Sequence, residues 1–497
     1  MSEQVAVFRC DASGQLGSGH VVRCLALADA LRAAGWSCAF ASVPGTAETV
    51  PALARSGHRL IELADPAREA ASLELALPQG CNLLVVDHYR RDAEFESACR
   101  PWASRILVID DLANRRHDCE LLLDPTLGRQ AADYAPLAPE SCRMLLGPDF
   151  ALLRPQFLAA RPAALRRRTS QHTIRRILVS LGGTDPSNLT GKVLRGIVLS
   201  GVEAAIDVVL GGTAPHLEEV RALAAACPLA TSVHTAVEDM AGLMSNADLA
   251  VGAAGTTSWE RCALGLPSLM LVIADNQELI ARSLDQAGAA ACLGRHETVS
   301  EEQLAAGVSA LATNPGRLNA MAARAADICD GRGTQRTMLA LLRPAKSKLG
   351  NPVALRLVAA ADEAMILAWQ RNPATRRYAR NPALPTADEH HAWMQARLAD
   401  PNCMFAVVEC AQVPAGVLRL DRKKEAGNTH EVSIFVAPEL HRQGLGICAL
   451  ALARQLLPGA ELIAEVLPEN EGSAKLFSLA GYRRYDDGLL HCPPQAC

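Results

Sequence analysis

The sequence predicts an α/β protein in which two Rossmann-like lobes precede a smaller α+β domain. Its 497 residues are too many for one hydrophobic core, since single cores stop growing at about 250–300 residues. Short apolar runs alternate with helical patterns before residue 345, whereas later runs have an antiparallel character. We expect domains at residues 1–160, 161–345 and 351–490, with Pro344–Gly350 as a linker between the last two.

The composition excludes several classes of protein. A hydrophobic fraction of 49% and a charged fraction of 21% are typical of globular proteins, and a net charge of -4 does not favour a nucleic-acid partner. The 16 cysteines are scattered without a CxxC pair, which favours free thiols in a cytoplasmic protein. Apolar stretches such as Leu269–Ala274 are too short to cross a membrane, and the oligomeric state stays open.

The first lobe begins with a strand at Val5–Phe8 and an amphipathic helix from about Gly19 to Ala34. Apolar runs at Ala39–Val43, Leu83–Val86 and Ile106–Ile109 predict further strands. Because helical patterns separate these strands, we expect a parallel sheet that binds ligands at the carboxyl ends of its strands.

A polar, glycine-rich loop follows the first strand and contains Asp11, Gly17 and His20. Glycines let the backbone turn sharply and approach a ligand closely. His20 falls in the first turn of the next helix, where the helix dipole disfavours imidazolium, so a neutral ring can accept a proton from water. The alternative is a structural histidine hydrogen-bonded to the loop.

A second polar group, Asp87, His88 and Tyr89, ends another strand of the same sheet. It is expected to face the same crevice as His20, although a turn with a capping aspartate is the alternative. Asp110 and Asp111 do not form a glycosidase-like pair of carboxylates, because adjacent residues on a strand point to opposite faces.

The second lobe has predicted strands at Ile177–Leu181, Ala205–Leu210, Leu249–Val251 and Ser268–Ile273. Two glycine-rich turns follow strands and offer backbone N–H groups to a phosphate. The candidate binding residues in these turns are Gly183, Thr184, Gly255, Thr256 and Thr257.

Three further polar residues of this lobe are candidates for contacts with a nucleotide sugar. Glu260 is suited to bind ribose hydroxyls in a bidentate manner, and Asn276 and Gln277 carry amides for sugar hydroxyl or acetamido groups. An acid near a helix N-terminus and a polar helix start are the alternatives for these positions.

The order of these motifs over about residues 1–345 resembles the nucleotide-sugar hydrolases of pseudaminic acid synthesis. The matching segments are GSGHVVRCLALADAL, VVDHY, IDDLANRRHDCELLLDPT, LLGPDFALLRPQF, SLGGTDPSN and GAAGTTSWERCALGLPSLMLVIADNQ. That family releases 2,4-diacetamido-2,4,6-trideoxy-L-altropyranose from its UDP-linked form and is similar in fold to the two-domain GT-B glycosyltransferases. The resemblance implies that His20 activates water, that segment 252–277 holds UDP, and that no metal is required.

The last domain resembles the GNAT N-acetyltransferases over about residues 350–490. The resemblance depends on a strand at Glu431–Val436, a glycine turn before a helix, and a further strand at Leu462–Val466 before Asn470. It implies that acetyl-CoA is the co-substrate, that Glu431 is a base acting through water, and that Asn470 contacts the pantetheine arm. By the same resemblance, the pyrophosphate is held by the backbone of Gln443, Gly444, Leu445 and Gly446.

This domain departs from the GNAT pattern at two positions. His441 stands where Gln or Arg is usual, and Phe477 stands where many members have a tyrosine acid. Tyr482 is a weak substitute for that acid, and a non-catalytic module is the alternative.

Both halves together predict a bifunctional enzyme. The hydrolase would convert UDP-2,4-diacetamido-2,4,6-trideoxy-beta-L-altropyranose to the free sugar and UDP, and the acetyltransferase would act on the preceding UDP-4-amino sugar. Two alternatives are a GT-B glycosyltransferase that uses a UDP-sugar and a nucleotide-sugar binding protein without turnover.

Overall fold

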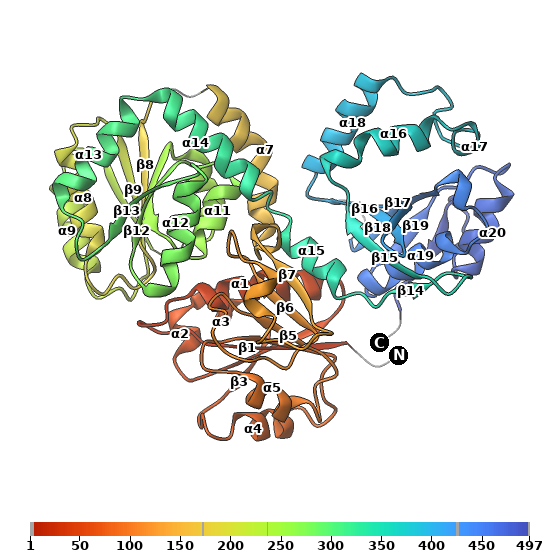
Figure 1. The fold of residues 1–497 in the computed structure, drawn as a ribbon, viewed down its shortest axis with the longest axis horizontal. Helices are drawn as coiled ribbons and strands as arrows, with labels where there is room; N and C mark the ends of the chain where they lie inside the picture. Colours follow the sequence, from red (N-terminus) through yellow and green to blue (C-terminus); the bar gives the residue numbers. More distant parts are fainter. Residues whose placement is uncertain (1–3, 171–172, 236, 424–426, 496–497) are drawn as a thin grey trace. The chain divides into compact units, whose positions relative to one another are not determined.

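A computed structural model describes residues 4–170, 173–235, 237–423 and 427–495 (Figure 1). The chain divides into two compact units. The larger unit holds Val5–Asp29 and Ser37–Thr334, and the smaller unit holds Ala30–Trp36 and the chain from Gln335 onward. No helix in the described ranges is both long and apolar enough to span a membrane.

The larger unit contains a seven-stranded parallel sheet with the order β3-β2-β1-β4-β5-β6-β7. The strand order reverses between β1 and β4, which is where ligands bind in such sheets. The strands are β1 (Val5–Cys10), β2 (Ser37–Ser42), β3 (Arg59–Glu62), β4 (Leu83–Asp87), β5 (Ile106–Ile109), β6 (Leu121–Asp124) and β7 (Arg143–Leu146). The helices are α1 (Gly19–Ala33), α2 (Thr46–Thr49), α3 (Pro51–Arg55), α4 (Glu69–Ala76), α5 (Ala93–Cys99) and α6 (Ala131–Tyr134).

A second, six-stranded parallel sheet follows α7 (Pro155–Ser170) and has the order β10-β9-β8-β11-β12-β13. Ile177 and Val179 of β8 belong to one core cluster and Leu178 to another, so helices cover both faces of this sheet (Figure 1). The strands are β8 (Arg176–Ser180), β9 (Ala205–Leu210), β10 (Thr231–Thr235), β11 (Leu249–Ala253), β12 (Ser268–Val272) and β13 (Ala291–Arg295). The helices are α8 (Leu189–Leu199), α9 (Leu217–Ala225), α10 (Met240–Asn246), α11 (Thr257–Ala263), α12 (Glu278–Gln286), α13 (Glu301–Ala312) and α14 (Pro315–Ile328). The next helix, α15 (Gly333–Ala340), begins in the larger unit and belongs from Gln335 onward to the smaller one.

The smaller unit is built on an eight-stranded sheet with the order β14-β15-β16-β17-β18-β19-β21-β20. Its pairs are antiparallel except β18 with β19, which are parallel. The strands are β14 (Ala345–Lys346), β15 (Pro352–Leu357), β16 (Cys403–Cys410), β17 (Val413–Arg422), β18 (Thr429–Val436), β19 (Glu461–Ala464), β20 (Arg483–Arg484) and β21 (Leu490–Cys492). The helices are α16 (Glu363–Arg371), α17 (Pro373–Arg376), α18 (Ala387–Ala399), α19 (Leu445–Leu456) and α20 (Glu471–Leu479).

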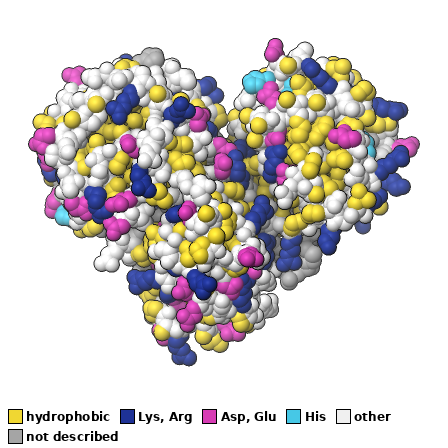
Figure 2. Space-filling model, in the orientation of Figure 1, with side chains coloured by type: hydrophobic (Ala, Val, Ile, Leu, Met, Phe, Trp, Pro, Cys, Tyr) yellow, Lys and Arg dark blue, Asp and Glu magenta, His cyan; other side chains and the backbone are white. Residues whose placement is uncertain are grey.

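The predicted α/β class, with two parallel sheets and an α+β domain, is confirmed. One local prediction was wrong: the expected linker Pro344–Gly350 contains β14, which pairs with β15 in a hairpin. Its proline, lysines and glycine are turn and edge-strand residues rather than linker residues. Acidic and basic side chains are interspersed over the visible surface of the larger unit (Figure 2).

Candidate functional site

His20 lies in the first turn of α1 and is 7% exposed. Its Nδ1 is 2.6 Å from Oδ1 of Asp87, the last residue of β4. The strands β1 and β4 are neighbours, and Cys10 pairs with Asp87 in their register. The chain leaves β1 and enters α1 only a short loop later, so His20 and Asp87 meet at the carboxyl edge of the sheet.

Arg23 lies one turn after His20 and binds the same carboxylate in a bidentate manner. Its Nε donates to Asp87 Oδ2 and its Nη2 to Asp87 Oδ1, both at 2.6 Å. Burial opposes ionisation of Asp87, yet the charge of Arg23 and the hydrogen bonds from Arg23 and His20 hold the pKa of this carboxyl well below its usual range. Because Asp87 is an anion, His20 donates to it through Nδ1–H, and Nε2 is the ring nitrogen that this contact leaves unused.

Tyr89 stands edge-on to His20, with ring centroids 4.6 Å apart. Its hydroxyl donates to Asp111 Oδ2 at 3.4 Å and accepts from Nδ2 of Asn276 at 2.7 Å. Burial raises the pKa of Tyr89, so the hydroxyl keeps its proton. This chain of hydrogen bonds joins residues that follow β4, β5 and β12, and it therefore connects both sheets of the larger unit.

Asp11 and His88 form a hydrogen bond with each other and not with His20. His88 Nδ1 accepts from the backbone N–H of Arg90 at 3.0 Å, so its Nε2–H donates to Asp11 Oδ2, also at 3.0 Å. Arg9 Nη1 donates to Asp11 Oδ1 at 2.6 Å, and the backbone N–H of Val43 donates to it at 2.9 Å. These bonds fix the loop that leads to His20.

The glycine-rich loop of the first lobe lies close to two threonines of the second. A Cβ on Gly19 would be 3.0 Å from Thr256 Oγ1, so only glycine fits there without a shift. Thr184 Oγ1 donates to the carbonyl oxygen of Gly14 at 3.2 Å. Gly17 has a φ of +75° and donates to the carbonyl of Ser13 at 2.9 Å, which closes the turn between them.

The side chain of Arg261 forms hydrogen bonds at both ends of the loop between β11 and α11. This buried side chain donates through Nη2 to the carbonyl of Ala253 at 2.7 Å and to Ser258 Oγ at 2.9 Å. Gly255 and Thr256 therefore have a fixed backbone, and Thr257 begins α11. A Cβ on Gly255 would lie 3.6 Å from Gln277 Nε2. Gly183 accepts from the N–H of Gly211 at 2.8 Å.

Glu260 is a buried carboxyl on α11 and is 7% exposed. Burial raises the pKa of Glu260 to about 7, against the opposing charges of Arg154 and Arg261. Arg154 Nη2 is 3.8 Å from Glu260 Oε1, which is too long for a hydrogen bond. The carboxyl oxygens therefore retain capacity for hydroxyl donors.

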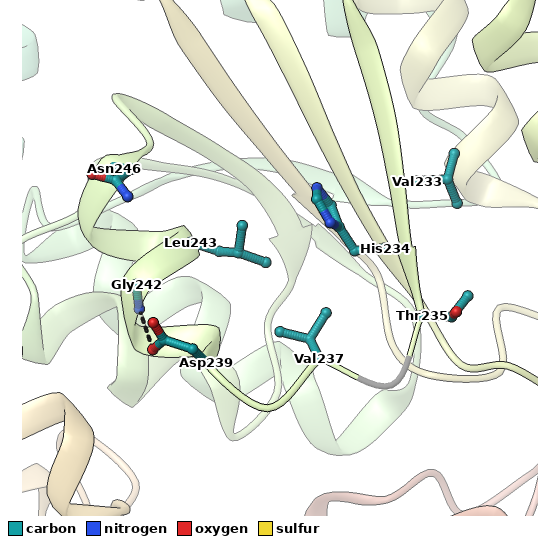
Figure 3. A pocket seen from close by; sticks show the side chains of 8 residues that line it. All are labelled: Val233, His234, Thr235, Val237, Asp239, Gly242, Leu243 and Asn246. Carbon is teal, nitrogen blue, oxygen red and sulfur yellow. Dashed lines mark hydrogen bonds between the residues drawn. The ribbon is translucent and has the colours of Figure 1, made fainter.

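A pocket of about 610 Å³ lies between the edge strand β10 and α10 (Figure 3). Its lining residues are Val233, His234, Thr235, Val237, Asp239, Gly242, Leu243 and Asn246. His234 Nε2 is 2.7 Å from Asp207 Oδ1, and Asp239 caps α10 by accepting from the N–H of Gly242 at 2.8 Å. The predicted site residues do not line this pocket, and its ionisable groups already have partners, so we assign it no role.

In the smaller unit, the glycine turn opens α19 as the sequence predicted. Gly444 precedes the helix with a φ of +83°, and the backbone N–H groups that follow it have no intrahelical acceptor. A Cβ on Gly446 would be 2.9 Å from Leu476 Cδ2, so this glycine allows α20 to pack closely. Gln443 accepts from the N–H of Lys348 at 3.0 Å.

Glu431, the predicted base, is held by two cations. Oε1 accepts from Arg380 Nη2 at 2.5 Å, and Oε2 accepts from Lys423 Nζ. Burial favours the neutral acid, yet these two cations hold the pKa of Glu431 below its usual range. The paired part of β18 and β19 ends at Glu431 and Ile463. Arg380 also forms an ion pair with Glu465, which lies just after β19, and its Nε is 2.7 Å from Oε2 of that glutamate.

Asn470 uses its side-chain oxygen to cap α20, accepting from the N–H of Ser473 at 3.0 Å. Phe477 packs edge-on against Tyr482, with centroids 4.9 Å apart. Burial and the nearby Cys492 raise the pKa of Tyr482, while Arg454 opposes that shift. Arg454 lies about two and a half helical turns beyond the start of α19, so Tyr482 is poorly placed to act as an acid at the glycine turn.

Two family models match the chain. Residues 209–332 match the glycosyltransferase family 28 C-terminal domain, and residues 353–483 match the acetyltransferase (GNAT) domain. The chain therefore ends in a GNAT-like domain. In fold, the chain is similar to MurG from Acinetobacter baumannii, with a TM-score of 0.50 and 17% identity over 68% of this chain and 98% of MurG. That likeness supports the two-lobed arrangement of parallel sheets.

Curated relatives match parts of the chain. The spore coat polysaccharide biosynthesis protein SpsG of Bacillus subtilis is 37% identical over 33% of this chain and 47% of its own length. An uncharacterised protein of Methanocaldococcus jannaschii is 24% identical over 52% of this chain, so the chain spans about half the length of these two relatives (47% and 54%).

A third relative, the UDP-2,4-diacetamido-2,4,6-trideoxy-beta-L-altropyranose hydrolase of Campylobacter jejuni, is 25% identical over 44% of this chain and 73% of its own length. Together with the GNAT match, this similarity confirms the two resemblances predicted from the motifs.

Within the described residues, no group of three or more His, Cys, Asp or Glu side chains is arranged to hold a metal ion.

Proposed function

We propose that the larger unit hydrolyses UDP-2,4-diacetamido-2,4,6-trideoxy-beta-L-altropyranose to the free sugar and UDP. The observation that supports this proposal is the set of contacts around Asp87, which binds Nδ1 of His20 and the guanidinium of Arg23 at the carboxyl edge of the sheet. We assign Nε2 of His20 as the proton acceptor. The similarity to the hydrolase from Campylobacter jejuni supports the choice of substrate.

In the proposed reaction, His20 Nε2 removes a proton from water as the water oxygen bonds to the anomeric carbon. The bond from that carbon to the diphosphate oxygen breaks, and its electron pair leaves with UDP. Asp87 accepts from Nδ1–H of His20 and so holds the ring in the required tautomer and orientation. Arg23 binds the same carboxylate and partly neutralises its charge. Asp87 therefore stabilises the protonated form of His20 less than it would without Arg23.

The second lobe supplies the UDP site in this proposal. Glu260 accepts hydrogen bonds from the ribose hydroxyls, and the segment Gly255–Thr257, with Gly183 and Thr184, donates to the diphosphate. Asn276 and Gln277 are the residues we assign to the acetamido sugar. Asn276 donates to the hydroxyl of Tyr89, whose ring stands edge-on to His20, and this connection supports the assignment.

The GNAT-like domain is proposed to acetylate the 4-amino group of the preceding UDP-4-amino sugar. The amine nitrogen attacks the thioester carbonyl of acetyl-CoA, the carbon–sulfur bond breaks, and CoA leaves as the thiol with the proton that the amine loses. The backbone of Gln443–Gly446 would hold the pyrophosphate, and Asn470 would contact the pantetheine arm. The chain would then carry two consecutive steps of pseudaminic acid synthesis as a cytoplasmic bifunctional enzyme.

Mass spectrometry of the reaction products tests both the hydrolase and the acetyltransferase assignments. The purified protein is incubated with the UDP-4-amino sugar, with and without acetyl-CoA. We expect the diacetamido sugar and UDP only when acetyl-CoA is present, and UDP from the pre-acetylated substrate in either case. Absence of an acetylated product would refute the acetyltransferase, and absence of UDP release from the pre-acetylated substrate would refute the hydrolase.

The match to a glycosyltransferase domain favours one alternative, transfer of the sugar to an acceptor other than water. The rate of UDP release without any acceptor separates the two reactions. Release that depends on an added sugar or lipid acceptor would favour the transferase, whereas binding of the UDP-sugar without UDP release would favour a binding protein.

A further inference from the structure

The hairpin of β14 and β15 is an ordered part of the smaller unit that begins before the GNAT match, which starts at residue 353. Ala345 pairs with Val353, and Lys346 pairs with Pro352. The N–H of Ser347 donates to the carbonyl of Asn351 at 2.9 Å, which closes the turn. The segment therefore adds a strand and a short turn to the edge of the sheet.

This hairpin lies against the glycine turn that opens α19. The N–H of Lys348 donates to the carbonyl of Gln443 at 3.0 Å, and Cys448 Sγ donates to the carbonyl of Lys346 at 3.3 Å. A Cβ on Gly444 would lie 3.0 Å from Lys348 Cγ and 3.7 Å from its Cδ. The aliphatic part of Lys348 thus packs directly on the glycine of this turn.

The ammonium group of Lys348 is only two bonds beyond Cδ, so it remains close to the turn. Lys348 is exposed, and among the described residues no carboxylate forms an ion pair with it. An ammonium without a carboxylate partner beside backbone N–H groups that lack acceptors forms a cationic surface. Such a surface favours a phosphate-bearing ligand, to which lysine contributes a mobile point charge.

We propose that Lys348 is a binding residue for acetyl-CoA, and that its ammonium contacts the phosphates of the cofactor at the glycine turn. This inference rests on the proposed acetyltransferase activity. The UDP-linked acceptor also carries a diphosphate, so the experiment must measure both ligands. We assign the contact to acetyl-CoA because Lys348 packs on Gly444, in the turn that the GNAT domain would use for the cofactor.

Isothermal titration of the full-length protein with acetyl-CoA tests this assignment. We expect Lys348→Ala to raise the Kd for acetyl-CoA about tenfold, Lys348→Arg to raise it less than about threefold, and the Kd to depend less on salt in the alanine variant. Lys346→Ala is the matched control, because this lysine lies in the same hairpin and contacts α19 through its backbone carbonyl. Its Kd should stay within about twofold of the original value.

Three outcomes would overturn the inference while the acetyltransferase assignment stands. They are an unchanged or lower Kd in Lys348→Ala, an equal loss in Lys346→Ala, and a loss confined to titration with the UDP-4-amino sugar. Equal melting temperatures and equal rates of UDP release in all variants show that the fold is retained. If the unaltered protein does not bind acetyl-CoA, the acetyltransferase assignment itself is wrong, and the inference falls with it.

Discussion

The two predicted bases, His20 in the larger unit and Glu431 in the smaller one, have opposite surroundings. His20 is held at one nitrogen by Asp87, which leaves the other nitrogen available. Glu431 is bound at both oxygens, by Arg380 and by Lys423. The contrast shows that the partners of a base, more than its residue type, decide whether it has an atom with which to accept a proton.

A second contrast concerns two glutamates. Burial raises the pKa of Glu260 to about 7, whereas the cations around Glu431 overcome the effect of burial and hold its pKa below the usual range. The larger unit therefore contains a carboxyl that titrates near neutral pH, and the smaller unit contains one that stays ionised. Each of these differences can be tested by substitution.

The largest effect is expected for His20→Asn. Removing the proton acceptor should lower the rate of UDP release about 10²- to 10⁴-fold, because that is the usual contribution of a general base. The Kd for UDP should stay within about twofold, since His20 does not belong to the proposed nucleotide site. Stopped assays of UDP release and titration with UDP measure the two quantities.

His216→Asn is the control, because His216 is a histidine of the second lobe that bonds to Glu219 at the surface. This variant should hydrolyse the substrate at the normal rate. A near-normal rate in His20→Asn would show that another group activates the water.

Arg23→Met should have the next largest effect. It removes the cation that binds Asp87 and leaves a buried charge, which costs about 3–5 kcal/mol of stability in typical proteins. Without Arg23, the charge of Asp87 acts on His20 alone and favours the protonated ring. The acidic limb of the pH profile of kcat/KM should therefore move to higher pH, and Arg23→Lys should restore part of the original profile. A profile that keeps its position in Arg23→Met would show that Arg23 only supports the fold.

The sequence predicted the architecture well because long apolar runs and glycine turns carry that information locally. Among the strands that escaped prediction, β3 and β10 are edge strands with few buried residues, whereas β6 is fully buried but only four residues long. The hairpin that contains β14 was interpreted as a linker, since its few residues carry the composition of a turn.

For the candidate site, the sequence predicted that His20 and the group around Asp87 face the same crevice, but not the hydrogen bond between them. Arg23 was missed because an arginine on an amphipathic helix is usually a solvent-exposed residue, and only the position of Asp87 makes it buried. Of the two cations around Glu431, Arg380 comes from the loop after α17, 51 residues away in sequence, so no local pattern reveals this contact. Lys423 lies just after β17, in the connection that leads to β18.

A moderate effect is expected for the pH dependence of nucleotide-sugar binding. The folded-state pKa of Glu260 is about 7, against 4.5 for an ordinary glutamate, and ribose hydroxyls bind best to the ionised form. In a His20→Asn background, affinity for the UDP-sugar should therefore rise about tenfold between about pH 6 and pH 8. The diphosphate diester does not titrate in this range, so Glu260→Gln should remove the dependence.

The raised pKa of Glu260 also determines how the stability of the fold changes with pH. The folded protein binds the Glu260 proton more tightly than the unfolded chain does, so this group stabilises the fold at low pH. That contribution is lost as the pH rises from about 4.5 to about 7. Urea unfolding should show a smaller fall in stability over this window for Glu260→Gln than for the original chain. Identical slopes would contradict the raised pKa.

The smallest effect is expected for Glu431→Gln, and it bears directly on the comparison of the two bases. Because both oxygens of Glu431 are bound by cations, we expect acetyl transfer to fall only about threefold, measured as release of the CoA thiol. Glu465→Gln is the matched control, since it also removes a carboxylate partner of Arg380. A loss of about 10²-fold in Glu431→Gln alone would show that the acceptor displaces a cation and frees the carboxylate to act as a base. In that case His20 could accept a proton without a change of partners, whereas Glu431 could do so only after the acceptor binds.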